Sequence, residues 1–173
     1  MLRGPKKVES EADVYAAALR ALMRRAHSVY EMRRELERRC DEKTLVRRVL
    51  NRLKSENLLD DARYARQFAR QQAETRRRGR YRIARDLRGR GVPDRHIEAA
   101  LAEIFEEVDE TALLRKRIER RLRTLRGPMN ERKLASLYAS LLRAGFSVHA
   151  IRRELRALTR MDPGEAELPS GEE

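Results

Sequence analysis

Residues that interrupt helices or crosslink chains are scarce in this sequence of 173 residues. It contains no tryptophan, 5% aromatic residues, eight glycines, five prolines and one cysteine. So few helix breakers are typical of an all-helical protein, whose core must then consist mainly of Leu, Ile, Val and Ala. The lone Cys40 excludes an internal disulfide and argues against a structural zinc site.

Long apolar segments are also lacking. No run approaches the ~18 residues that a membrane span needs, and residues 1–7 carry charge without the apolar stretch of a secretory signal. We therefore expect a cytoplasmic protein that makes no use of a membrane.

Catalytic and cofactor motifs are missing as well. His27, His96 and His149 are scattered along the chain, and no HExxH, CxxC or GxxxxGK[ST] pattern occurs. Cys40 has no histidine near it in sequence to activate it. The sequence thus predicts no enzyme, no cofactor and no metal, and leaves a binding protein as the remaining class.

Positive charge, by contrast, is abundant. The formal net charge is +13, and 35 of the 41 basic residues are arginine, since only six are lysine. The planar guanidinium binds phosphates and carboxylates through two parallel hydrogen bonds. A GC-rich genome would explain arginine in place of lysine, but it would not explain the uncancelled charge. This balance favours a polyanion or an acidic protein surface as partner.

A three-helix unit recurs roughly every fifty residues. Its marker is two large residues and one small residue at spacing four, followed by a turn: Met32-Leu36-Cys40, Ile83-Leu87-Gly91 and Leu137-Leu141-Gly145. Spacing of four places each trio on one helix face, and a final glycine suits a left-handed cap. Such units must stack to bury a core. We predict an all-α fold of three tandem three-helix repeats stacked into an elongated, curved body.

Local signals place the boundaries of these repeats. Ser28 followed by Glu31 predicts a capping box, and Asp60 or Asp61 can cap a later helix. The first helix should bury the stripe Tyr15, Ala18, Leu19, Leu22 and Met23. We place a flexible basic arm at residues 1–12, repeats at 13–60, 61–107 and 108–160, and a disordered acidic tail at 161–173.

The first candidate binding surface is an arginine-rich stretch between two apolar stripes. It comprises Arg76, Arg77, Arg78, Arg80, Tyr81, Arg82, Arg85 and Arg88. The last three arginines recur every third residue and so share a helix face, while Ile83 and Leu87 point to the core. The earlier ones should lie in a mobile loop, where Tyr81 can stack on a base or a partner surface. Few acidic residues stand at i+3 or i+4 to offset this charge. A solvated helix face is the plainer alternative, and we favour binding.

A second surface follows on the next predicted helix. Its members are Arg115, Lys116, Arg117, Arg120, Arg121, Arg123 and Arg126, relieved only by Glu119 in that segment. We expect Arg115, Arg117, Arg120 and Arg121 to contact a partner. The apolar positions 114, 118, 122 and 125 should take the buried stripe and leave the arginines outward. A binding role and a plain solvated surface are evenly matched here.

Three pieces of the chain together resemble the RecX family. Residues 57–65 (N-L-L-D-D-A-R-Y-A) match its G-L-[IL]-[DN]-D-x-x-[FY]-A junction, and residues 82–92 match its R-I-x-x-E-L-x-x-K-G-[IV] stretch. Ser28 with residues 33–36 resembles the start of its first repeat. Asn57 stands where the family commonly has glycine, Asp86 replaces Glu and Arg90 replaces Lys. The similarity extends from about residue 13 to 160.

The resemblance implies a function that charge and periodicity do not. It implies a negative regulator of the RecA recombinase that binds the groove of the RecA–DNA filament. Such a regulator inhibits filament growth, strand exchange and ATP hydrolysis by RecA, and so modulates recombination, DNA repair and the SOS response. Its partners would be the RecA filament and, by direct non-specific contact, single- and double-stranded DNA. The two arginine surfaces would carry these contacts, and we expect a monomer. The alternative is a stand-alone, non-specific DNA-binding protein of architectural or helix-turn-helix-like type.

Overall fold

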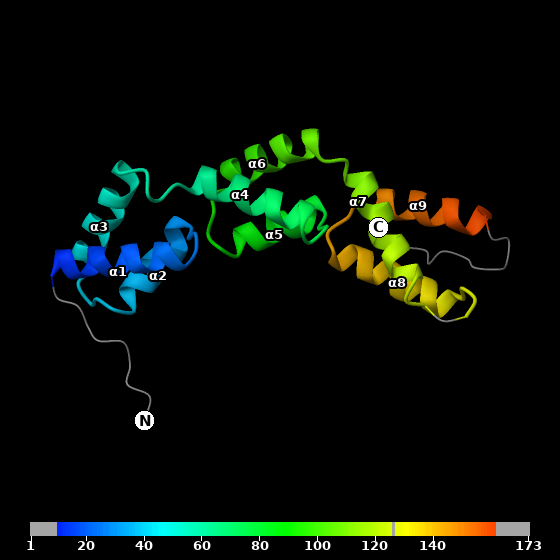
Figure 1. The fold of residues 1–173 in the computed structure, drawn as a ribbon, viewed down its shortest axis with the longest axis horizontal. Helices are drawn as coiled ribbons and strands as arrows, with labels where there is room; N and C mark the ends of the chain where they lie inside the picture. Colours follow the sequence, from blue (N-terminus) through cyan, green and yellow to red (C-terminus); the bar gives the residue numbers. More distant parts are fainter. Residues whose placement is uncertain (1–9, 126, 162–173) are drawn as a thin grey trace, which may run out of the picture. The chain divides into compact units, whose positions relative to one another are not determined.

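Helices account for all the regular structure in the part of the chain that is described. The computed structural model describes residues 10–125 and 127–161, and the predicted tail lies outside this range except for Met161. The helices are α1 (Glu11–Arg24), α2 (Val29–Glu37), α3 (Lys43–Ser55), α4 (Asp61–Glu74), α5 (Arg80–Arg88), α6 (Asp94–Glu107), α7 (Glu110–Leu122), α8 (Glu131–Arg143) and α9 (Val148–Met161) (Figure 1). The predicted all-α fold is confirmed. None of these helices is both long and apolar enough to cross a membrane.

The first three helices pack around one apolar cluster. Its buried members are Val14, Ala17, Ala18, Ala21, Met32, Leu36, Cys40, Val46, Val49, Leu50, Leu53 and Leu59. On α1 the buried face is thus mainly alanine, and small side chains let neighbouring helices approach closely. The predicted stripe was partly wrong, because Met23 is 86% exposed while Ala18 is fully buried. Cys40 is a core residue here, which fits a structural role.

Several predicted helix ends are confirmed. Ser28 and Glu31 form the full capping box at the start of α2. The Asp60 carboxylate accepts hydrogen bonds from the backbone N–H groups of Ala62 and Arg63 and so caps α4. Asp61 acts differently, because its carboxylate accepts from the backbone N–H of Val29, 32 residues earlier. This carboxylate ties the start of α2 to the start of α4.

Left-handed backbone closes helices where glycine was predicted to do so. Gly91 has φ +69° and Gly145 has φ +92°. Asn57, which stands at the family's glycine position, also adopts positive φ, at 55°. Asparagine tolerates this conformation better than most residues do. The departure from the family pattern therefore keeps the backbone conformation.

The last three helices form a second apolar cluster of their own. α7, α8 and α9 all contact one another. The large, fully buried side chains there include Leu114, Leu137, Leu141, Ile151 and Leu155. The predicted stripes on these helices are therefore confirmed at these positions.

The described residues divide into two compact units that do not follow the repeats. Residues 10–68 and 86–100 form one unit, and residues 69–85 and 101–161 form the other. Each of α4, α5 and α6 contributes residues to both units. The repeat boundaries given above remain predictions, although residues 60 and 108 both fall between helices.

Candidate functional site

Two predicted binding arginines of α5 form ion pairs with carboxylates that lie outside α5. Arg80 donates from Nε to Glu110 Oε2 at 3.0 Å, and its guanidinium lies 5.1 Å from the centre of the Phe105 ring. Arg88 Nε lies 2.7 Å from Asp94 Oδ1. The sequence analysis considered acidic residues only at positions i+3 and i+4, and therefore missed these two carboxylates, which lie further away in the chain. Arg80 and Arg88 therefore form ion pairs within the protein, in addition to adding positive charge to the surface.

The rest of α5 is a mixture of buried, held and open side chains. Ile83 and Leu87 are fully buried, as predicted. Arg82 is half-buried and donates to the carbonyl oxygen of Arg143 at 3.4 Å. Arg85 is exposed, and Tyr81 is 62% exposed. The predicted arginine face thus offers Arg85 and Tyr81 most openly to a partner.

The segment between α4 and α5 is held in place by its backbone. Gly79 N donates to the carbonyl oxygen of Ala144 at 2.9 Å, and Tyr81 N donates to that of Gly145 at 3.1 Å. Arg78 N donates to the carbonyl oxygen of Gln72, near the end of α4, at 3.1 Å. These bonds fasten the predicted loop to α4 and to the end of α8. The segment can therefore present side chains in a defined arrangement.

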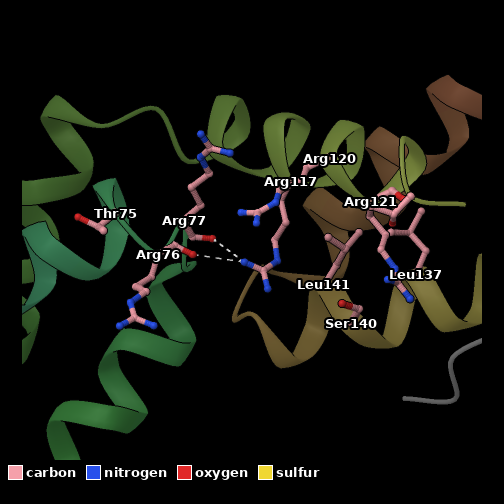
Figure 2. A pocket seen from close by; sticks show the side chains of 10 residues that line it. Thr75, Arg76, Arg77, Arg117, Arg120, Arg121, Leu137, Ser140 and Leu141 are labelled. Carbon is pink, nitrogen blue, oxygen red and sulfur yellow. Dashed lines mark hydrogen bonds between the residues drawn. The ribbon is translucent and has the colours of Figure 1, made fainter.

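A cavity of about 370 Å³ brings together arginines from both predicted surfaces. Its lining consists of Thr75, Arg76, Arg77, Arg117, Arg120, Arg121, Thr124, Leu137, Ser140 and Leu141 (Figure 2). Half of these ten residues are arginine, and none of them is acidic. Sequence reasoning proposed the arginines but did not predict that the two stretches meet. We call this feature the arginine cavity.

Arg117 is the residue that links the two sides of the arginine cavity. Its Nη1 donates to the carbonyl oxygens of Arg76 at 3.3 Å and Arg77 at 3.4 Å, as Figure 2 shows. Burial lowers the pKa of the Arg117 guanidinium, and repulsion from Arg78 and Arg120 lowers that pKa further. The prediction that all arginines of this helix point outward was wrong here. Half-buried Arg117 thus lies close to other cations, and an anion bound there would relieve their mutual repulsion.

Arg115, the first arginine of the second surface, faces a carboxylate of α9. Its Nε and Nη2 donate to the two carboxylate oxygens of Glu154 at 2.6 and 3.3 Å. The hydrogen bond from Arg115 lowers the pKa of the buried Glu154 carboxyl, although burial opposes that shift. The statement that only Glu119 relieves this surface was therefore wrong. The pair holds α7 to α9, whereas Arg120 and Arg121 of this surface are exposed. Arg126, which the sequence also placed in this surface, lies outside the described residues.

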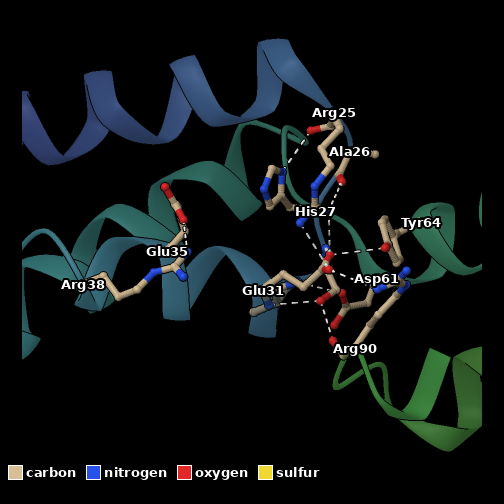
Figure 3. A network of polar contacts seen from close by, with 11 residues as sticks. Arg25, Ala26, His27, Glu31, Glu35, Arg38, Asp61, Tyr64 and Arg90 are labelled. Carbon is tan, nitrogen blue, oxygen red and sulfur yellow. Dashed lines mark hydrogen bonds and ion pairs between the residues drawn. The ribbon is translucent and has the colours of Figure 1, made fainter. Parts of the chain in front are cut away.

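A second polar cluster surrounds Glu31, and sequence reasoning gave that residue only a capping role. Its carboxylate accepts from Arg25 at 3.1 Å, from Arg90 at 3.3 Å and from the Tyr64 hydroxyl at 3.2 Å (Figure 3). Burial, followed by the nearby Glu31 charge, raises the pKa of Tyr64 to about 12. No local pattern predicts contacts 33 and 59 residues away. The cluster joins helices and offers no reacting pair, so we assign it to stability.

Side chains that commonly bind metal ions do not gather at one place among the described residues. No group of three or more His, Cys, Asp or Glu side chains among them is placed to hold a metal ion. Arginine, threonine and serine are instead the polar side chains of the arginine cavity. These are hydrogen-bond donors suited to anionic oxygen.

Comparison with known proteins identifies the family. Residues 60–101 match the model of the RecX second three-helix domain. The regulatory protein RecX of Halorhodospira halophila is 38% identical over 154 residues, which cover 88% of this chain and 92% of that protein. The regulatory protein RecX of Prosthecochloris aestuarii is 34% identical over 152 residues, covering 86% and 97%. The crystal structure of RecX from Lactobacillus salivarius shares the fold, with a TM-score of 0.74, 22% identity, and coverage of 87% of this chain and 97% of that one. From matches of this identity and extent, we conclude that the chain belongs to the RecX family of regulatory proteins.

Proposed function

We propose that this protein is a negative regulator of the RecA recombinase. It binds in the groove of the RecA–DNA filament and inhibits filament growth, strand exchange and ATP hydrolysis, and so modulates recombination, DNA repair and the SOS response. The observation that carries this proposal is membership of a family whose curated members are named regulatory protein RecX. The sequence has no nucleotide-binding P-loop of its own, so any effect on ATP hydrolysis acts through RecA.

Charge supports an anionic partner of this kind. The chain carries a net charge of +13, and a filament of protein on DNA exposes both phosphates and acidic side chains. Opposite charge raises the rate of encounter and fixes orientation more than it adds affinity. We also propose direct, non-specific contact with single- and double-stranded DNA, by a monomer in the cytoplasm.

The predicted binding residues fall into three groups in this proposal. Arg80, Arg88 and Arg115 are paired with carboxylates and hold helices in position. The contacts with the filament come from the open or cavity-lining members: Arg76, Arg77, Tyr81, Arg85, Arg117, Arg120 and Arg121. Arg78 and Arg82 form the third group. They are close in sequence to the contact residues, but each has interactions of its own within the protein.

Strand exchange by RecA tests the α5 part of this surface. We expect Tyr81→Ala combined with Arg85→Glu to weaken inhibition about tenfold, because it removes an exposed ring and reverses an exposed charge. Arg47→Glu reverses an exposed charge on α3, a helix that contributes no predicted binding residue, and should inhibit as the unmodified protein does. Circular dichroism checks that both variants keep their helices. Equal inhibition by both variants would remove α5 from the contact surface.

A stand-alone DNA-binding protein is the second candidate. The observation that favours it is the arginine cavity, because no acidic residue lines it. Non-specific DNA binding depends mainly on arginine and lysine contacts to phosphate. This candidate needs no RecA, so the two functions are separable in experiments with DNA alone and with RecA present.

A further inference from the structure

We propose that the arginine cavity binds the phosphodiester backbone of a nucleic-acid strand, through half-buried Arg117 and exposed Arg120 and Arg121. This site deepens the proposed direct contact with DNA and rests on that part of the proposed function, but it does not depend on regulation of RecA. The strand is held by its phosphates, independent of base sequence. Uncompensated charge, the orientation of Arg117 and the chemistry of the lining support this assignment.

Uncompensated charge is the first step. Two arginines of the predicted surfaces in the same unit pair with carboxylates, Arg80 with Glu110 and Arg115 with Glu154. Within the described residues Arg120 and Arg121 have no carboxylate partner, and none lines the cavity. Close cations repel one another unless an anion is bound between them. The cavity therefore gathers positive charge that an external anion can neutralise.

Orientation of Arg117 is the second step. The carbonyl oxygens of Arg76 and Arg77 accept hydrogen bonds from Nη1 only. Within residues 10–125 and 127–161, nothing accepts from Nε or Nη2, and neither atom is sealed from solvent. Figure 2 shows this guanidinium between the α4–α5 segment and Ser140 and Leu141 of α8. A guanidinium held on one edge presents its other donors in a fixed direction, which lowers the entropy lost on binding.

The chemistry of the lining is the third step. One carboxylate has two oxygens and pairs with a single guanidinium fork, whereas a strand supplies a charge at every phosphate. The hydroxyls of Thr75 and Ser140 add neutral donors, which bind phosphate oxygens in protein–DNA complexes. In protein–DNA complexes about half to two-thirds of the hydrogen bonds go to phosphate and sugar oxygens, and these contacts carry no sequence information. The lining therefore fits consecutive backbone phosphates better than an acidic peptide.

Salt-dependent binding of a labelled, mixed-sequence single-stranded oligonucleotide tests this site without RecA. Fluorescence anisotropy of the full chain is measured over a range of salt concentrations. We expect Arg120→Gln with Arg121→Gln to bind about tenfold more weakly. We also expect the slope of log K against log salt to fall by about 1.4, because each lost phosphate contact removes about 0.7 on a single strand. Both side chains are exposed and have no ion pair within the described residues, so the fold should survive the substitutions.

A matched control removes the same charge elsewhere in the same unit. Arg132→Gln with Arg143→Gln changes two exposed arginines of α8 outside the cavity. This control should weaken binding less than threefold, since it alters only the long-range field. If the control weakened binding as much as the cavity variant does, general charge and not the cavity would bind the strand, and the proposal would be overturned.

Two further measurements distinguish other anions. Arg117→Lys keeps the charge but loses the fork, so affinity should fall while the salt slope stays the same. Displacement of the strand by pyrophosphate beyond the effect of its ionic strength would indicate a site for small anions and overturn the strand assignment. Loss of RecA inhibition by the Arg120/Arg121 variant with unchanged DNA binding would assign the cavity to a protein surface and overturn it too.

Discussion

At the residue scale, two glycines let the α4–α5 segment lie directly against the end of α8. A Cβ at Gly79 would lie 2.3 Å from the carbonyl oxygen of Gly145, and one at Gly145 would lie 2.2 Å from the backbone nitrogen of Arg82. Real side chains do not approach backbone so closely. This contact positions Arg76 and Arg77, whose carbonyl oxygens hold Arg117.

Replacing Gly145 by alanine should therefore be far more costly than an ordinary glycine change. Gly145→Ala adds a backbone clash to a positive φ, and we expect a loss of about 4 kcal/mol in the free energy of unfolding, or failure to fold. Gly127→Ala is the matched control, since Gly127 has φ +73° but its Cβ would meet only Lys133 Nζ, at 3.7 Å. Its cost should be about 1 kcal/mol. Chemical denaturation measures both, and similar costs would contradict the close approach.

Residue-level prediction from sequence succeeded where the cause was local. The glycine caps at Gly91 and Gly145 depend on backbone angles within one turn, and both were predicted correctly. The arginine partners were missed because Glu110 and Glu154 stand 30 and 39 residues from Arg80 and Arg115. Met23 was misplaced because an apolar residue within reach of a helical stripe need not lie on its buried side. What limited these predictions was the separation in the chain between contacting residues, and not the residue types involved.

At the element scale, the carboxylate of Glu31 connects α2 to the preceding segment and to later parts of the same unit. Its carboxylate contacts Arg25 before α2, Tyr64 on α4 and Arg90 in the turn after α5. The Ser28 hydroxyl donates to the carbonyl oxygen of Arg90 at 2.5 Å and so connects the same elements. The capping box was visible in the sequence, whereas the partners that make it a joint were not.

Glu31→Gln should destabilise the protein in a pH-dependent way. Burial alone would raise the pKa of the Glu31 carboxyl, but hydrogen bonds from Arg25 and the Ser28 backbone outweigh it and hold that pKa below its usual value. The ionised form is thus favoured in the folded state, and its contribution is fully present above the ordinary glutamate pKa. We expect Glu31→Gln to lower the free energy of unfolding by about 2 kcal/mol at neutral pH.

The difference between the two proteins should shrink as pH falls through the lowered pKa of Glu31, because protonation removes the same charge that the substitution removes. Urea denaturation at a series of pH values measures it. Glu37→Gln at the exposed end of α2 is the control, with an expected change within about 0.5 kcal/mol. A constant difference down to strongly acidic pH would show that the ionised carboxylate is not what stabilises the joint.

At the scale of the whole molecule, net charge is the property that connects sequence to partner. The described helices use many acidic residues in ion pairs, yet the chain as a whole stays at +13. The five acidic residues of the predicted tail, which lies beyond the described residues, counter this charge: Asp162, Glu165, Glu167, Glu172 and Glu173. A tail of opposite sign can compete with an anionic partner for the basic surface.

Deleting the residues after Arg160 should therefore tighten DNA binding. The deletion removes five negative charges from a chain of net charge +13 and leaves +18. We expect severalfold higher affinity for a single-stranded oligonucleotide at low salt, with the gain disappearing as salt screens the charges. Anisotropy titrations of both proteins check this. A salt-independent gain, or none, would mean that the tail does not compete electrostatically.

The proposed regulation of RecA is tested most directly by ATP hydrolysis on single-stranded DNA. This protein is added in amounts well below one per RecA, with DNA in excess so that competition for bare DNA cannot imitate inhibition. We predict loss of ATP turnover at these low ratios, because a regulator of a filament acts on many protomers at once. Inhibition that begins only when the protein is abundant enough to cover the DNA would contradict this function and favour a stand-alone DNA-binding protein.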